Sequence, residues 1–164
     1  MTPAELGQTE LKTLVASLHD DLESLDRLEA KLDAVISRMG KEPDPADVMA
    51  AAGYLHHIYT AVEAMGERIL TTVDGALPSG ERWHQELLGR LGLEMDGVRP
   101  AVIRAETRAR LARLLRFRHF FRHAYRIDFL WAEVEPLVGD IHVVVEDTRA
   151  DIEAFCGHLQ RCAD

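Results

Sequence analysis

Apolar residues recur at every third or fourth position through the first quarter of the chain, and this spacing constrains the fold more than any other sequence feature. It matches the 3.6-residue period of an α-helix, so it predicts one long amphipathic helix over residues 3–39. Thr2–Pro3 is a typical helix start and Gly40 a typical stop. Such a helix needs other helices to cover its apolar stripe. The stripe comprises Leu6, Leu11, Leu14, Val15, Leu18, Leu22, Leu25, Leu28, Leu32, Val35, Ile36 and Met39.

Two further helices are predicted in the middle of the chain. The first begins at Pro45, with Asp44 as its N-cap, and extends to about Val73. The second is short, with Ser79 as its expected cap, because glycines interrupt the pattern soon afterwards.

The helical pattern resumes over residues 101–131, and a last helix follows, with Pro136 at its start or at a kink. No segment shows the alternation of a strand. We therefore expect an all-α fold, a bundle of four to five helices with a long N-terminal helix. A chain of 164 residues, 47% hydrophobic and 29% charged, suits a single domain over residues 1–164.

Basic and acidic residues are distributed unevenly. The net charge of −9 argues against simple wrapping of nucleic acid. Residues 100–126, however, contain eight arginines and one acid, Glu106, which leaves 11 basic and 27 acidic residues elsewhere. Such a block can be a solvated helix face or an anion site inside an acidic shell. We expect a homodimer paired around residues 100–131, in which carboxylates of the second subunit offset the arginines.

The sequence contains no apolar run long enough to cross a bilayer and no pattern of a secretory signal, so a cytoplasmic protein is expected. Cys156 and Cys162 are expected to be free thiols, because a structural zinc site needs two such pairs.

The most distinctive segment is RFRHFFRHAY, residues 116–125. On a helical wheel of residues 117–127, the polar side chains share about 160° of arc. That face carries three arginines, two histidines and Tyr125, whereas the apolar side chains point the opposite way. The simpler interpretation is a basic, solvated face. The polar set is Arg118, His119, Arg122, His123, Tyr125 and Arg126.

These residue types suit metal-free RNA cleavage. Histidine can take a proton from a ribose 2′-OH near neutral pH, and arginine can stabilise the charge of a phosphorane-like transition state. His119 and His123 also have the i, i+4 spacing of a metal clamp. No carboxylate accompanies them on that face, and the arginines would repel a cation, so no metal and no cofactor are expected.

The segment LLRFRHFFRHAYRIDFLWAEVEPLV, residues 114–138, resembles the signature of HepT-type toxins with a HEPN domain. Their motif is Arg, four residues, His, one residue, Tyr, which matches Arg118, His123 and Tyr125. Ile127–Asp128 and Trp131 follow at similar spacing. The stretches PSGERWHQELL and YLHHIYTAVEAMGERI also look like HepT-like relatives, so the resemblance extends from about residue 50 onward.

The resemblance implies a homodimeric HEPN bundle with both motif copies facing a shared cleft. It implies a metal-independent endoribonuclease, the toxin of a type VII-like toxin–antitoxin pair, with Arg118 and His123 as catalytic residues. His119 and Arg122 would support the RNA phosphate. The implied antitoxin is an MntA-type nucleotidyltransferase, which would silence the toxin by attaching AMP to Tyr125.

Two alternatives remain open at this stage. The chain departs from the family pattern at His119, where Asn is common, so a non-catalytic HEPN-type module that binds RNA, nucleotide or protein is the second hypothesis. An acidic adaptor with an arginine groove for an acidic partner protein is the third. Outside the motif, Trp83 and His84 are interpreted as core-packing residues, and Glu63 is expected to be solvated.

Overall fold

The computed structural model describes residues 7–124 and 128–163. Within them the chain forms five α-helices and a π-helical turn, and no β-strand. The expected all-α class and five-helix bundle with a long N-terminal helix are confirmed. In order the elements are α1 (Gln8–Arg38), α2 (Pro45–Ile69), η2 (Leu70–Asp74), α3 (Trp83–Leu91), α4 (Ala105–His123) and α5 (Trp131–Ala163).

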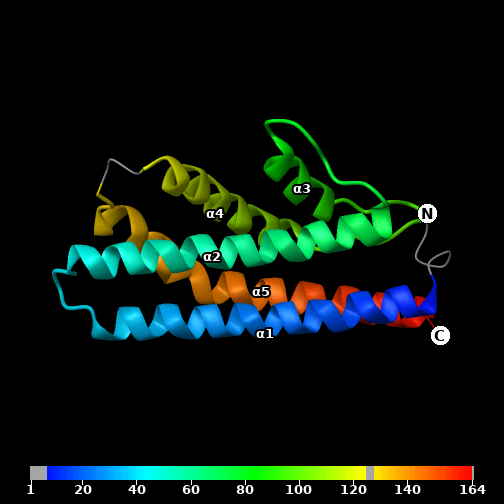
Figure 1. Cartoon of the computed structure of the whole chain (residues 1–164), viewed down its shortest axis with the longest axis horizontal. Coiled ribbons are helices and arrows are strands. Elements are labelled where there is room, and N and C mark those ends of the chain that lie inside the picture. The colour runs from blue at the N-terminus through cyan, green and yellow to red at the C-terminus, as the bar shows by residue number, and fades with distance from the viewer. Residues whose placement is uncertain (1–6, 125–127, 164) are drawn as a thin grey trace.

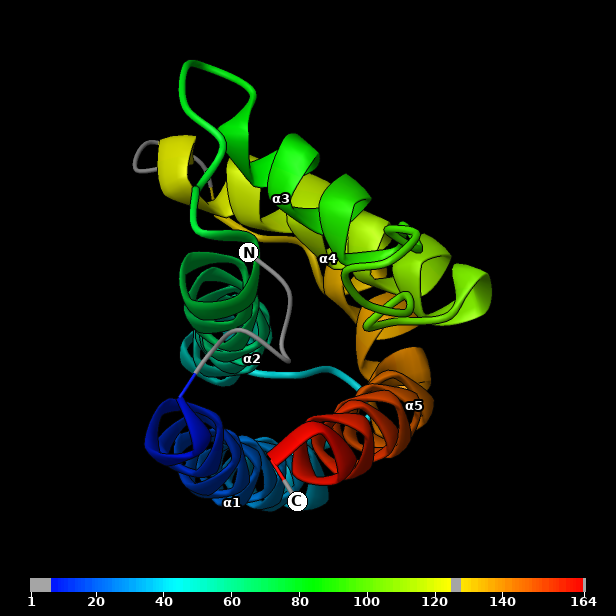
Figure 2. The ribbon, with the colours of Figure 1, turned by 90° about the vertical axis from the view of Figure 1, so that its right-hand side faces the viewer.

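The helices form two groups. The long helices α1, α2 and α5 run along the length of the molecule, and each packs on the other two (Figure 1). Viewed from the end, α3 and α4 lie together on the far side of α2 and α5 from α1 (Figure 2). Helix α4 packs on α2, α3 and α5. Helices α3 and α4 therefore form a layer that packs against the long helices, and we call α1, α2 and α5 the long-helix base. Helix α4 of this layer carries the motif residues up to His123.

Helix α1 supplies a large share of the core. Leu11, Leu18, Leu25 and Leu32 recur at intervals of seven residues, and each is at most 1% exposed. Full burial of one such side chain contributes about 1.5–3 kcal/mol. The long stripe predicted from the sequence is therefore the face that α2 and α5 cover.

A glycine lets α3 approach α2 closely. A Cβ added at Gly66 would lie 2.7 Å from Leu91 Cδ1 and 2.9 Å from Leu87 Cδ2, shorter than real Cβ contacts. This contact sets α3 along the line of α2 that also carries Glu63, one turn before Gly66. It therefore places the start of α3, with His84, opposite Glu63.

Several predicted boundaries differ from the structure. Asp44 caps α2 as expected, accepting a hydrogen bond from the Ala46 amide at 2.7 Å. Ser79 does not cap α3, whose N-cap is Arg82 without a side-chain hydrogen bond. The predicted helix over 101–131 is too long, because α4 ends at His123. Pro136 lies inside α5, which begins at Trp131.

None of the helices in the described part of the chain combines the length and apolar character that a membrane span needs.

A buried ion pair fastens the loop after α3 to the end of η2. The Arg99 guanidinium donates to both carboxylate oxygens of Asp74, at 2.6 and 2.9 Å, and the Arg99 side chain is fully buried. Its other hydrogen bonds go to the carbonyls of Arg90, Leu93 and Pro100. Since the same loop leads into α4, this pair helps to fix where α4 begins.

We predict that Asp74→Ala lowers the free energy of unfolding by about 3–5 kcal/mol, because it leaves the Arg99 charge buried without its partner. Urea unfolding followed by circular dichroism measures this. The control is Asp21→Ala, which breaks the partly exposed pair with Arg68 and should cost about 1 kcal/mol or less. Equal losses for the two variants would contradict the prediction.

Candidate functional site

Aromatic contacts anchor the end of α4 on α2. The Phe121 ring stacks on His56 of α2, with centroids 4.9 Å apart, and on Phe129, with centroids 5.2 Å apart. Phe117 is buried beneath them. The expected apolar face of this helix is therefore present, although Phe120 lies at its edge and is 38% exposed. These contacts hold the last turns of α4, which carry the motif.

Three side chains from three helices meet beside this anchor. Glu63 of α2 accepts from His84 of α3, with Nδ1 and Oε2 2.6 Å apart. Its other oxygen pairs with Arg118 of α4, with Nη2 and Oε1 3.3 Å apart. The Glu63 side chain is only 4% exposed and that of Arg118 only 11%. We call these three residues the Glu63 cluster.

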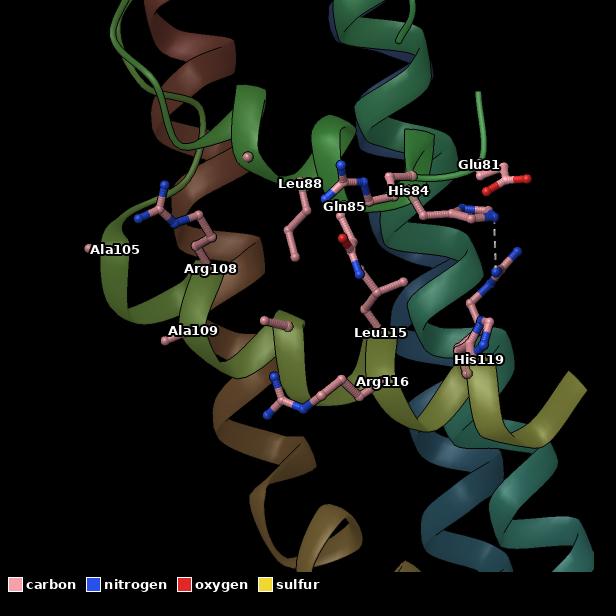
Figure 3. Close-up of a pocket in the computed structure, with 14 residues that line it drawn as sticks. Glu81, His84, Gln85, Leu88, Ala105, Arg108, Ala109, Leu115, Arg116 and His119 are labelled. Carbon is pink, nitrogen blue, oxygen red and sulfur yellow. Dashed lines mark hydrogen bonds between the residues drawn. The ribbon is translucent and has the colours of Figure 1, made fainter. Parts of the chain in front are cut away.

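The cluster closes through the imidazole of His84. Arg118 Nη1 lies 3.3 Å from His84 Nε2, the contact drawn as a dashed line in Figure 3. A guanidinium can only donate, so His84 Nε2 accepts and Nδ1–H donates to the carboxylate of Glu63. Each member of the cluster thereby orients the other two.

The sequence-based interpretation was wrong for Glu63 and incomplete for His84. Glu63 was expected to be solvated, but it is buried and paired. His84 was assigned to core packing with one hydrogen-bonded ring nitrogen, but both of its ring nitrogens have partners, Glu63 and Arg118, which themselves form an ion pair. One sequence feature could have indicated that Glu63 is buried: it lies one helical turn before Gly66, and a glycine within a helix often marks close packing against another helix. Sequence spacing alone does not show which residue of α3 that acid meets.

Arg118 is therefore not displayed on an open face as the helical wheel predicts. Two of its nitrogens engage the cluster, and its Nε is buried without a hydrogen-bond partner in the described part of the chain. By contrast, His119, Arg122 and His123 are exposed. The polar arc thus divides into one buried arginine and a group of accessible side chains.

His123 is held by its own helix. Its Nδ1 lies 2.7 Å from the carbonyl oxygen of His119, and the two imidazole centroids are 4.7 Å apart. Since a carbonyl only accepts, Nδ1 carries the proton. The neutral ring therefore presents Nε2 as a proton acceptor, which is the form that a general base requires.

His56 completes the surroundings of Arg118. Burial lowers the pKa of His56 below its usual 6.5, and the positive charges of Arg118, His57 and Arg122 lower it further. Its Nδ1 is buried without a partner in the described residues. Because the shift favours the neutral ring near pH 7, His56 adds no positive charge beside Arg118.

Tyr125 and Arg126 lie outside the described residues, so their predicted places on the wheel are not tested. Within the described residues, no hydrogen bond or ion pair joins Arg118 to His123. The structure thus groups His119 with His123, and Arg118 with Glu63 and His84.

The expectation about the arginine block needs correction. Three arginines on one side of the block pair with aspartates of α5 in the same chain, rather than requiring carboxylates of a second subunit. The argument for a homodimer from charge repulsion is therefore weakened. The pairs are Arg104 with Asp147 and Asp151, Arg110 with Asp147, and Arg113 with Asp140.

No group of three or more histidine, cysteine, aspartate or glutamate side chains suited to a metal ion occurs among the residues described. The arrangement that is present offers a proton acceptor, exposed cations and a fixed guanidinium, which are groups suited to chemistry on a phosphate ester.

We predict that Glu63 and Arg118 are energetically coupled. Glu63→Gln and Arg118→Gln should each lower the free energy of unfolding by about 1.5–3 kcal/mol. The double variant should lose less than the sum, by about 0.5–3 kcal/mol, because neither charge is then left alone in the interior. Urea unfolding of the four proteins measures the coupling.

The control for this cycle is the exposed pair of Glu23 and Arg27 within α1. Its coupling should not exceed about 0.5 kcal/mol. Strictly additive losses at Glu63 and Arg118 would show that the buried pair does not act as a unit.

Comparison with known proteins identifies the family of the chain. A family model described as HepT-like protein matches residues 50–159, a range that contains all three members of the Glu63 cluster and the motif. Searches of curated proteins and of solved structures give no match. The family resemblance expected from the sequence is thereby confirmed. Because the match covers well over half of the chain, the protein belongs to the HepT-like family.

Proposed function

We propose that the protein is a metal-independent endoribonuclease with its reaction centre at the end of α4. The observation that supports this most is the hydrogen bond from His123 to the His119 carbonyl, which leaves an exposed Nε2 able to accept a proton. Exposed cationic side chains lie on the same turns. The protein also belongs to the HepT-like family, and the resemblance of its motif to the family signature is the reason for assigning Arg118 and His123 to catalysis.

In the proposed reaction, His123 Nε2 takes the proton of a ribose 2′-OH. The 2′ oxygen attacks the adjacent phosphorus, the bond to the 5′ oxygen breaks, and a 2′,3′-cyclic phosphate forms. The departing 5′ oxygen takes a proton from solvent or from an imidazolium. The crowded transition state carries extra negative charge, which Arg118 and Arg122 would stabilise, with His119 as a further donor.

The Glu63 cluster gives Arg118 a fixed orientation in this scheme. A guanidinium that is already ordered loses little conformational freedom when a phosphate arrives. Glu63 and His84 are therefore positioning residues in the proposal.

We further propose that the protein acts as a homodimer and as the toxin of a toxin–antitoxin pair. The cognate antitoxin would be an MntA-type nucleotidyltransferase that attaches AMP to Tyr125. This part rests on membership of the HepT-like family. An added AMP phosphate beside the motif would compete with the RNA phosphate for its arginines.

A non-catalytic RNA-binding or interaction module is the second candidate. It is favoured by the engagement of Arg118 with Glu63 and His84, which gives that arginine a structural role without any substrate. This candidate predicts RNA binding without cleavage.

We predict that His123→Ala abolishes RNA cleavage and growth inhibition while the fold is retained, because the side chain is exposed and serves as the base. Arg118→Lys should be nearly as damaging, since lysine keeps the charge but loses the planar fork. Cleavage of a fluorescent oligoribonucleotide measures this, with circular dichroism to verify folding.

The control is His142→Ala, an exposed histidine on α5 that pairs with Glu29. It should cleave like the wild type. Wild-type cleavage should also persist in EDTA, and loss in EDTA with recovery in zinc would mean that a metal takes part. Unchanged cleavage by His123→Ala would rule out its assignment as the base.

We predict that Tyr125→Phe retains cleavage but is no longer silenced by the antitoxin, because it lacks the hydroxyl that would receive AMP. Intact mass after incubation with the nucleotidyltransferase and ATP measures the labelling. The wild type and the control Tyr54→Phe should each gain one or more AMP units, and Tyr125→Phe none. Equal labelling of all three proteins would place the modification elsewhere.

A further inference from the structure

A long groove separates α3 from α4 and opens beside the Glu63 cluster (Figure 3). It has a volume of about 990 Å³. Its apolar lining comes from Leu88 on α3 and from Ala109, Ala112 and Leu115 on α4. At one end the groove is lined by Arg118, so it is continuous with the candidate reaction centre.

The groove is lined by three arginines of α4 that do not pair with α5, namely Arg108, Arg116 and Arg118. The arginines on the other side of the helix pair with aspartates of α5, as described above. Arg108 and Arg116 line the groove instead, both are exposed, and neither has a carboxylate partner among the described residues. Arg82 lines the groove from the α3 side. Among the residues that line the groove, only Glu81 is acidic.

This concentration of positive charge is notable in a chain with a net charge of −9. Neighbouring cations without counter-charges repel one another, and a bound anion removes that repulsion. Arg108 is also held in place, because its side chain lies against Gly92, where an added Cβ would meet Arg108 Cδ at 2.9 Å. The groove is thus built to present cations.

The spacing of these cations suits a linear polyanion rather than a single phosphate. Arg108 and Arg116 are eight residues apart on α4, which separates them by about 12 Å along the helix axis. Arg118 lines the same groove where it meets the Glu63 cluster. A volume of about 990 Å³ is that of a small-ligand cleft and would not admit a duplex.

We propose that this groove binds the single-stranded RNA segment that continues from the reaction centre. The inference rests on the proposed function, because the bound RNA segment is taken to extend from the proposed reaction centre. Phosphates contact Arg118, Arg116 and Arg108, and the flat bases cover the apolar surface of Ala109 and Ala112. Single-strand binding commonly depends on a positively charged groove that follows the backbone and on side chains that stack with the bases; here the imidazole rings of His84 and His119 line the groove beside Arg118. An acidic peptide would satisfy the arginines but leave this apolar surface unused.

The test measures binding separately from cleavage. A fluorescein-labelled, single-stranded 2′-O-methyl oligoribonucleotide has no 2′-OH and cannot be cut, so fluorescence anisotropy reports affinity alone. The groove variant Arg108→Gln/Arg116→Gln should bind at least about 10-fold more weakly. Its slope of log K against log salt should fall by roughly 1.4, since each lost single-strand phosphate contact removes about 0.7.

The matched control is Arg110→Gln/Arg113→Gln, which removes two arginines from the same helix but from the side that faces α5. It should keep the wild-type affinity within about 2-fold and the wild-type salt slope. Equal weakening of the two double variants would overturn the groove assignment, because net charge alone would then govern binding. Wild-type affinity in the groove variant would also overturn it.

Two further outcomes would favour other occupants of the groove, an acidic peptide or a second copy of the chain. A poly-glutamate peptide of equal charge that displaced the oligonucleotide equally well would overturn the assignment to RNA. A groove variant that changed from dimer to monomer by light scattering would make the groove an interface between copies instead. Failure of the proposed function would give a different result. The wild-type protein would then bind the 2′-O-methyl oligonucleotide but would not cleave an RNA substrate that has 2′-OH groups.

Discussion

The site depends on the hydrogen bond and the ion pair that the carboxylate of Glu63 forms with two neighbouring helices. This carboxylate is buried on α2 and accepts bonds from His84 of α3 and from Arg118 of α4, so one acidic group joins three helices. A buried carboxylate without partners would be costly, and so would a buried guanidinium. The partners therefore constrain one another, and the position of the motif arginine follows from where α3 lies on α2.

The arginine-rich helix shows how neighbouring charges of one type acquire different roles. Arginines that face α5 meet aspartates, and these pairs fasten α4 to the long-helix base. Arginines that face α3 meet an apolar groove instead. The difference arises from the neighbouring group that each side chain meets: Arg113 pairs with Asp140 of α5, whereas Arg116, one turn further along, lines the groove.

The fold was largely predictable because it depends on local periodicity. The apolar stripe of α1, the cap at Asp44 and the absence of strand patterns all follow from neighbouring residues. The end of α4 was not predictable in this way, because the helical apolar pattern continues past His123. Aromatic contacts of Phe121 with His56 and Phe129 accompany the end of the helix, and the contact with His56 joins residues far apart in the sequence.

The sequence by itself determined the helical class, the family and the residues of the motif, because each is encoded in spacing along one segment. Only the tertiary structure decided that Arg118 is mostly covered and paired with Glu63 and His84 while His123 stays exposed. A helical wheel describes one helix and cannot show which neighbouring helix covers each face. Burial and ion pairing depend on that neighbour, so the surroundings of the motif are a property of the packed bundle.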